Sequence, residues 1–346
     1  MNELLIVGNH LGATGASRAV GEDLAERLRQ RGVRVHTASG APNKAVRLYE
    51  MLHATWSRRR QYEVAVVDVF SGQAFRFAEA VCALLRRLRK PYVLALRGGD
   101  LPRFAARHPR RVARILTGAA AVTSPSSYLR CELASLRPDI LEIPNPIDCA
   151  RYPFQQRNAP APNLIWLRAF AGIYNPMLAP RVLAKVLELY PDCQLTMVGM
   201  DKGDGTLAAT HAEIARLGVE KQCRILPKVA KQEVPQALAS GDIFLNTANV
   251  DNTPVSVLEA MACGLCVIST NVGGLPHLLE HGQDSMLVPP DDAIAMADAV
   301  TAVLSSPELA TRISEQGRRK AESCDWSRVL DRWMELLDAC IARSRA

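Results

Sequence analysis

Short apolar runs alternate along this chain with longer segments in which apolar residues recur every three or four positions. Continuous runs of about 4–8 apolar residues indicate strands buried on both faces of a parallel sheet, and the longer spacing indicates amphipathic helices. Strands are therefore expected at Leu4–Val7, Val33–Thr37, Val64–Val69, Tyr92–Leu96, Ala120–Thr123, Leu141–Ile143, Leu164–Trp166, Gln194–Val198, Cys223–Leu226, Ile243–Asn246 and 266–270.

Helical patterns lie between these strands. In the first of them, Val20, Leu24 and Leu28 share one face, and a glycine follows its end. The helices with clear bounds are Ser17–Arg31, Pro180–Leu189, Leu207–Leu217, Val234–Leu238, Pro254–Cys263, Ala293–Leu304, Pro307–Ser323 and Trp326–Ala342. Two successive alternations of strand and helix predict an α/β protein with two Rossmann-like lobes and a cleft between them.

A proline-rich segment separates the two alternations. Residues 144–163 contain five prolines and little periodicity, which is typical of an interdomain linker. We expect a first lobe at 1–150, a linker at 151–163, a second lobe at 164–325 and a C-terminal helix at 326–346.

Composition narrows the class of protein. With 48% hydrophobic and 22% charged residues, the 346-residue chain is typical of a soluble globular protein large enough for two cores. Its longest apolar runs are too short to span a bilayer, and its acidic N-terminus leads directly into a strand rather than a signal peptide. Nine scattered cysteines favour reduced thiols and a cytoplasmic location.

The net charge of +7 is unevenly distributed. Residues 1–150 carry 23 Lys and Arg against 13 Asp and Glu, whereas residues 151–346 carry 19 against 22. The basic clusters, of which Arg58-Arg59-Arg60 is one, are either a solvated surface or a site of attraction to anionic lipid headgroups or a lipid-linked acceptor. Nucleic acid is disfavoured, because aromatic residues are few and do not alternate with the basic runs.

Residues 251–276, DNTPVSVLEAMACGLCVISTNVGGLP, carry the most specific chemistry. Asp251 precedes Glu259 by eight positions, and Thr253-Pro254 between them predicts an N-cap followed by proline at the first helical position. Both acids can then face one site, with the positive N-terminus of the helix between them. Carboxylates suit hydroxyl groups and a helix end suits a diphosphate, so the pattern favours a nucleotide-activated ligand.

This segment resembles the donor-binding signature of glycosyltransferase family 4. The family has two acids separated by seven residues, and the second acid is followed by AMA-x-G-x-PVI-x-T-x-VGG-x-P; here Glu259 is followed by AMACGLCVISTNVGGLP. The first acid is usually glutamate and is often followed by Phe-Gly, where this chain has Asp251 and then Asn252-Thr253-Pro254. IPNPID at 143–148 is also similar to an element before the hinge of that family.

The resemblance implies a GT-B fold, in which two Rossmann-like lobes face each other across a cleft. The first lobe would bind the acceptor, the second would bind the nucleotide sugar, and the C-terminal helix would cross back onto the first lobe. It also implies transfer of a sugar from a nucleotide-diphosphate sugar to a hydroxyl acceptor with retention of configuration, in bacterial cell-surface polysaccharide or glycolipid assembly. No cofactor or metal is expected, and the protein could be peripheral on the inner face of the membrane.

The family also assigns roles to residues of this chain. Glu259 would hold the ribose hydroxyls, Asp251 would contact the donor sugar, and Arg168 would grip the diphosphate. A lysine normally follows that arginine by five positions, but this chain has Ile173. Either Lys202 or Lys228 could supply the second charge, and either could equally be a surface lysine.

Further contacts follow from the same resemblance. Arg97, where many relatives have histidine, would contact the sugar, with Asp100 beside it, and both could instead form a structural ion pair. The loop at Gly12–Gly15 would approach the diphosphate or the acceptor, or be an ordinary turn; its glycines do not form G-x-G-x-x-G, which disfavours NAD. The remaining substrate-binding candidates are Val229 near the base and Asn252, Thr253, Pro254, Val255 and Ser256 at the helix start.

Other chemistries are disfavoured. Cys263 and Cys266 have C-x-x-C spacing, but one lies at a helix end and the other enters a strand, so neither a redox nor a zinc site is indicated. Two alternatives to a transferase stay open. The chain could be a catalytically silent GT-B binding or scaffold subunit, or it could be a sugar-nucleotide epimerase of the same fold.

Overall fold

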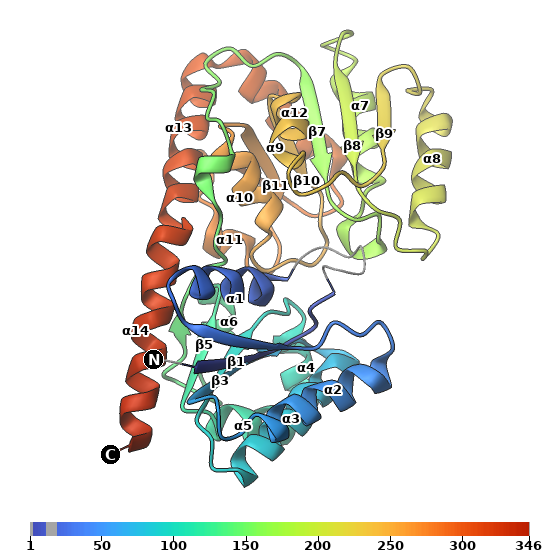
Figure 1. Cartoon of the computed structure of the whole chain (residues 1–346). Helices are drawn as coiled ribbons and strands as arrows, with labels where there is room; N and C mark the ends of the chain where they lie inside the picture. Colours follow the sequence, from blue (N-terminus) through green and yellow to red (C-terminus); the bar gives the residue numbers. More distant parts are fainter. Residues whose placement is uncertain (1–2, 12–18, 346) are drawn as a thin grey trace. The chain divides into compact units, whose positions relative to one another are not determined.

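The computed structural model describes residues 3–11 and 19–345. The chain divides into two compact units: the first comprises Met1–Pro146 with Ser327–Ala346, and the second comprises Ile147–Trp326. Each unit contains a six-stranded sheet whose paired strands all run parallel, with helices packed on it (Figure 1). The expected α/β fold with two Rossmann-like lobes is confirmed.

The first sheet has the strand order β2-β1-β3-β4-β5-β6. All six positions of the third strand are buried, which explains why its sequence is apolar at every position except Asp68 rather than alternating. The strands are β1 Glu3–Val7, β2 Arg34–Ala38, β3 Val64–Val69, β4 Tyr92–Leu96, β5 Ala121–Ser124 and β6 Leu141–Glu142. The helices are α1 Val20–Gln30, α2 Lys44–Ser57, α3 Phe75–Arg87, α4 Leu101–Arg107, α5 Pro109–Thr117, α6 Ser127–Leu133 and α14 Trp326–Arg345.

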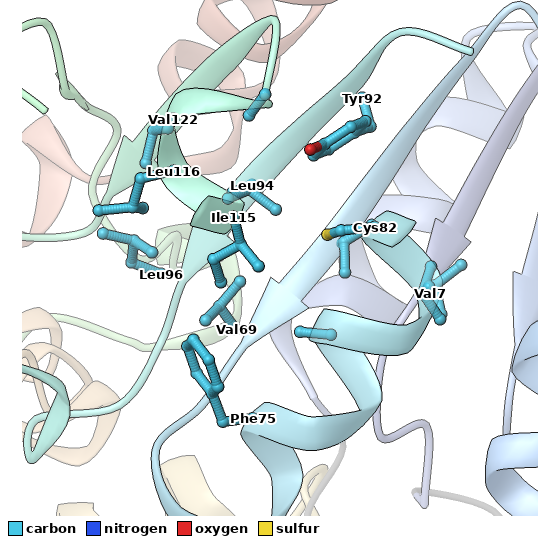
Figure 2. Packing of buried hydrophobic residues seen from close by; sticks show 14 of the residues in the cluster. Val7, Val69, Phe75, Cys82, Tyr92, Leu94, Leu96, Ile115, Leu116 and Val122 are labelled. Carbon is cyan, nitrogen blue, oxygen red and sulfur yellow. The ribbon is translucent and has the colours of Figure 1, made fainter. Parts of the chain in front are cut away.

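The core of the first unit lies between its sheet and its helices. Val69 and Leu96 from neighbouring strands lie near Phe75, the first residue of α3, and all three are fully buried (Figure 2). The Phe75 ring also packs at 4.7 Å from the ring of Phe104. Each side chain buried in this way contributes roughly 1.5–3 kcal/mol relative to an exposed one, so the core fixes the strand ends that carry polar residues.

The second sheet has the order β12-β11-β10-β7-β8-β9. The reversal of strand order beside β7 places polar loops at the carboxyl ends of β7 and β10 next to each other. The strands are β7 Asn163–Leu167, β8 Gln194–Val198, β9 Cys223–Leu226, β10 Ile243–Asn246, β11 Cys266–Thr270 and β12 Met286–Val288. The helices are α7 Leu178–Val186, α8 Thr206–Leu217, α9 Val234–Ala239, α10 Val255–Ala262, α11 Leu275–Leu278, α12 Ala293–Ser305 and α13 Pro307–Ser323.

Two details of the predicted elements are wrong. Helix α10 begins at Val255, and Pro254 is its N-cap in an extended conformation with no side-chain hydrogen bond, so Thr253 lies one position too early to be the cap. Helix α7 begins at Leu178 and ends at Val186, so the predicted helix at 180–189 is displaced toward the C-terminus. In both cases a proline set the predicted start, although proline also fits an N-cap or a position inside the first turn.

The proline-rich segment 147–163 lies within the second unit. The Ile147 amide donates to the Cys324 carbonyl at 3.0 Å, and the Cys149 amide donates to Asp325 Oδ2 at 2.9 Å. Tyr152 and Arg157 are only 3% and 4% exposed. This segment therefore packs as part of the second unit and brings its own side chains to the interior.

No single helix in the described part of the chain is long and apolar enough to cross a membrane. Helices α12 and α13 would reach that length together, but they meet at a bend of 102°.

Candidate functional site

The candidate site of the second unit lies where β7 and β10 end and α10 begins. Arg168 directly follows β7, and Asp251 lies in the loop between β10 and α10. Because the carboxyl ends of parallel strands share one edge of the sheet, residues distant in sequence meet there. The structure brings together three of the predicted residues, Arg168, Asp251 and Ser256.

Arg168 and Asp251 form an ion pair. Arg168 Nη2 donates a hydrogen bond to Asp251 Oδ2, and the two side chains are 18% and 10% exposed. The guanidinium also lies 4.4 Å from the centre of the Tyr174 ring, which attracts a cation to its face. Arg168 Nε is buried and has no hydrogen-bond partner among the described residues. The guanidinium is thus held in place, and one of its N–H groups has no partner among the described residues.

The loop that carries Arg168 is fixed by close contact between backbones. Phe170 N donates to Met200 O at 2.9 Å, and Lys202 N donates to Phe170 O at 3.2 Å. A Cβ atom at Gly199 would lie 1.7 Å from the Arg168 carbonyl oxygen, so this position requires glycine. The backbone of Lys202 therefore runs beside the loop that carries Arg168, and the side chain of Lys202 is exposed.

Tight backbone packing also fixes the loop before α10. Gly274 N donates to Asp251 O at 3.1 Å, and a Cβ at Gly273 would lie 2.1 Å from that same oxygen. Asn252, Thr253 and Ser256 are buried, whereas Val255 at the first helical position is partly exposed. The VGG turn of the signature thus acts by letting one backbone approach another, and it places Asp251 at the N-terminus of α10.

Glu259 lies in the second turn of α10 and is only 7% exposed. The Tyr152 hydroxyl donates to Glu259 Oε1 at 2.7 Å. Burial raises the pKa of Glu259, while the hydrogen bond from Tyr152 and the charges of Lys231, Arg168 and Arg151 act in the opposite direction. Burial beside Glu259 also raises the pKa of Tyr152, so this tyrosine stays protonated and acts as a donor.

The other predicted residues of the second unit lie farther along the sheet edge. Lys228 and Val229 follow β9; Lys228 is exposed, and Val229 packs partly buried against the cluster that contains α10. Ile173, at the position of the family's lysine, is 54% exposed. Within the described residues, no group of three or more His, Cys, Asp or Glu side chains is arranged to hold a metal ion.

A second polar cluster lies in the first unit, at the ends of β3 and β4. Arg97 Nε donates to Asp68 Oδ1 at 2.9 Å, and the side chains are 9% and 2% exposed. Arg97 Nη1 donates to Asn145 Oδ1 at 3.3 Å. Cβ atoms at Gly8 and Gly21 would lie 2.5 and 2.7 Å from Asp68 Oδ2. Arg97 is therefore enclosed in a buried ion pair, with Nη2 buried and lacking a partner among the described residues.

Two other polar residues of the first unit are exposed to different degrees: Asp100 lies at the surface, and His10 is buried. Asp100, also predicted to bind substrate, has a side chain that is 51% exposed and lies 3.9 Å from Arg103. His10 is buried, and burial lowers its pKa. It lines a cavity of about 260 Å³ together with Glu22, Arg29 and Ser39. Gly12 and Gly15 lie outside the described residues, so their predicted contacts remain predictions.

Sequence patterns did not indicate four residues of these clusters. Tyr152 was placed in the linker, and Tyr174 lay in a segment without a motif. Asp68 sits inside an apolar strand, VAVVDV, where an acid interrupting the run is the one signal that could have drawn attention to it. Arg318 of α13 donates from Nη1 to the carbonyls of Tyr152 and Ala262, at 3.1 and 2.7 Å.

Comparisons with known proteins agree with this description. The sequence model of the family described as Glycosyl transferases group 1 matches residues 161–320. The chain is 28% identical over 187 residues to the D-inositol 3-phosphate glycosyltransferase of Saccharomonospora viridis, covering 51% of this chain and 43% of the relative. It is 28% identical over 216 residues to the phosphatidyl-myo-inositol mannosyltransferase of Mycobacterium leprae. This match covers 60% of this chain and 56% of the relative. The chain thus spans about half the length of these curated relatives.

Solved structures match nearly the whole chain. HepE from Anabaena, in complex with UDP and glucose, aligns with a TM-score of 0.77 and 16% identity over 98% of this chain and all of that chain. Sucrose-phosphate synthase from Thermosynechococcus elongatus aligns with a TM-score of 0.81 and 16% identity. This alignment covers 99% of this chain and 100% of that chain. The second unit therefore matches the group 1 glycosyltransferases in sequence, and the whole chain is an α/β protein of the GT-B fold that resembles glycosyltransferase family 4.

Proposed function

We propose that this protein is a retaining glycosyltransferase that moves a sugar from a nucleotide-diphosphate sugar to a hydroxyl group of an acceptor. The observation that carries the proposal is the Arg168–Asp251 pair at the N-terminus of α10, with Glu259 buried in the next turn of that helix. These residues offer a cation and a helix end for a diphosphate and two acids for hydroxyl groups. The similarity to named glycosyltransferases supports the proposal.

The proposed roles follow the charges that develop during the reaction. The bond between the anomeric carbon and the diphosphate oxygen breaks, and its electron pair goes to the diphosphate. Arg168 and the positive end of α10 stabilise this growing negative charge, while Asp251 stabilises the positive charge on the sugar. The acceptor oxygen bonds to the anomeric carbon on the same face, and its proton passes to the leaving phosphate. Because protein groups supply the positive charge, the proposal requires no metal.

The ion pair prepares the site for an anion. In the absence of a diphosphate, Arg168 and Asp251 neutralise each other, so neither charge is left buried without a partner. A diphosphate can take over the guanidinium as a bidentate acceptor, which frees the Asp251 carboxylate for the hydroxyls of the donor sugar. The same two residues would thus serve the free and the loaded site.

The acceptor and the location are part of the proposal. The excess of basic residues in 1–150 favours a protein that visits an anionic membrane surface from the cytoplasm to reach a lipid-linked acceptor. Assembly of a bacterial cell-surface polysaccharide or glycolipid would require such an acceptor. The relative in Mycobacterium leprae is named for a lipid-linked inositol substrate, which supports this direction.

Replacement of Glu259 tests the nucleotide role. Glu259→Gln should weaken nucleotide binding by roughly 1.5–3 kcal/mol, the range for hydrogen bonds to a charged group. Calorimetry with UDP, GDP and ADP identifies the base and measures the loss. Glu188→Gln is the matched control, because Glu188 is exposed and paired with Lys185 on the same unit. Unchanged affinity in a folded Glu259→Gln protein would remove the ribose role.

A donor-hydrolysis assay distinguishes the transferase from a silent scaffold. A glycosyltransferase slowly releases nucleotide diphosphate from its donor when no acceptor is present, whereas a scaffold releases none. Absence of release from every UDP-, GDP- and ADP-sugar, together with detectable nucleotide binding, would favour the scaffold.

A further inference from the structure

Tyr152 and Glu259 form a buried hydrogen-bonded pair that joins two distant parts of the chain. They are separated by 107 positions, and their exposed fractions are 3% and 7%. Given the nucleotide role proposed above for Glu259, we propose that Tyr152 is a positioning residue that fixes the Glu259 carboxylate for the nucleotide ribose. The hydroxyl takes one acceptor position of Oε1, so Oε2 and the second lone pair of Oε1 are left to accept from the ribose hydroxyls.

The tyrosine is itself held by the surrounding fold. Its amide donates to the Cys149 carbonyl at 3.2 Å, closing a short turn. Its carbonyl accepts from Arg318 Nη1, and the same nitrogen donates to the carbonyl of Ala262, the last residue of α10. Arg318 therefore ties the backbone of Tyr152 to the helix that carries Glu259. A small shift between the two is resisted, as positioning of a carboxylate requires.

The apolar surroundings of Glu259 explain why its carboxylate needs a hydrogen-bond donor. Its neighbours on α10, Val257, Leu258, Ala260 and Met261, are fully buried. A carboxylate in such surroundings loses its hydration and tends to take up a proton. Tyr152 donates directly to this carboxylate, and the charges of Lys231, Arg168 and Arg151 also favour its ionised form. The ionised form is the one that accepts hydrogen bonds from a diol.

Tyr152→Phe removes this single donor. The ring of Tyr152 packs in the buried cluster around α10, and phenylalanine retains that packing. Without the hydroxyl, the Glu259 carboxylate loses a hydrogen bond that favours its ionised form, so its pKa rises further. UDP affinity should then fall about tenfold at neutral pH, and the ratio of variant to wild-type affinity should fall further as the pH is lowered, because the carboxylate of the variant takes up a proton at a higher pH than that of the wild type. The ratio at each pH cancels the titration of UDP itself.

The pH dependence of UDP affinity in Tyr152→Phe distinguishes a specific effect on the Glu259 carboxylate from a general loosening of the fold. A variant whose site is merely loosened loses affinity by the same factor at every pH, and that outcome would overturn the proposal. So would unchanged affinity. Tyr62→Phe is the matched control, because Tyr62 is a buried tyrosine in the first unit that donates to the Thr55 carbonyl at 2.9 Å. It should leave UDP affinity unchanged at all pH values.

A double variant shows whether Tyr152 acts through Glu259. If it does, Tyr152→Phe combined with Glu259→Gln binds UDP no more weakly than Glu259→Gln alone. Additive losses would mean that Tyr152 acts elsewhere, and the proposal would fail. Failure of the proposed function looks different, because Glu259→Gln alone would then have no effect. A silent Tyr152→Phe beside a weakened Glu259→Gln would overturn only the role of Tyr152.

Discussion

Each unit of the protein holds an arginine–aspartate pair at the carboxyl edge of its parallel sheet, but the two pairs are built differently. In the first unit, the side chains of Arg97 and Asp68 are 9% and 2% exposed. Gly8 and Gly21 pack so closely against Oδ2 of Asp68 that a Cβ atom at either position would clash with it. In the second unit, Arg168 and Asp251 are 18% and 10% exposed and lie on loops beside the N-terminus of a helix.

This difference in burial indicates that one pair stabilises the fold, whereas the other can exchange a partner for a ligand. A buried pair that loses one partner leaves an uncompensated charge away from water, so such a pair holds its geometry. A pair that is less buried and lies beside a helix end can exchange one partner for an anionic ligand at lower cost. We therefore expect the first pair to act mainly on stability and the second mainly on catalysis.

The largest effect is expected from breaking the buried pair. Asp68→Ala leaves the Arg97 guanidinium without its carboxylate and should lower the free energy of unfolding by about 3–5 kcal/mol. Urea unfolding followed by circular dichroism measures this loss. Asp100→Ala is the control, because that aspartate pairs at 3.9 Å with Arg103 at the surface and should cost at most about 1 kcal/mol. Equal losses for both variants would contradict the comparison.

The next effect is expected on turnover. Arg168→Ala should lower the rate of sugar transfer by about 10²–10³, because one group that stabilises the leaving diphosphate is lost. Nucleotide-sugar affinity should fall less than the rate, since charge on the diphosphate grows as the bond breaks. Lys185→Ala, which removes an exposed charge from α7, is the control. A nearly normal rate in Arg168→Ala would mean that another cation does this work, and Lys202 and Lys228 would be tested next.

The smallest effect is expected at the surface of the first unit. Helix α2 exposes Val46, Tyr49 and Trp56, and Arg59 lies 4.3 Å from the Trp56 ring in the basic cluster at its end. If this unit visits an anionic membrane, binding to anionic vesicles should weaken as salt shortens the Debye length to about 8 Å at physiological strength. Trp56→Ala should weaken binding severalfold, and Leu189→Ala, an exposed leucine of the second unit, should not. Equally poor recruitment to anionic and neutral vesicles at low salt would contradict the membrane proposal.

The sequence predicted the fold well wherever burial on both sheet faces dictated a continuous apolar run. Strands β4 and β10, in which every position is buried, begin and end at the predicted residues. The short β12, with three residues, and α11, with four, were missed because neither is long enough to show a period.

The candidate site could be predicted only in part. Its motif placed Asp251 and Glu259 on one helix start, because that information lies within nine consecutive residues. Their partners could not be found in this way. Arg168 meets Asp251 across 83 positions and Tyr152 meets Glu259 across 107, and such contacts depend on sheet topology rather than on local pattern. The family resemblance supplied Arg168, whereas nothing in the sequence pointed to Tyr152.

The three glycines that frame the site of the second unit also limit which substitutions that site can accept. At positions 199, 273 and 274, main chain touches main chain so closely that no side chain fits between. The loops that present Arg168 and Asp251 therefore form a rigid frame, and a change in the ligand that the site prefers has to come from the side chains that project from it. Variant libraries intended to alter ligand binding at this site are best built with these three positions held constant.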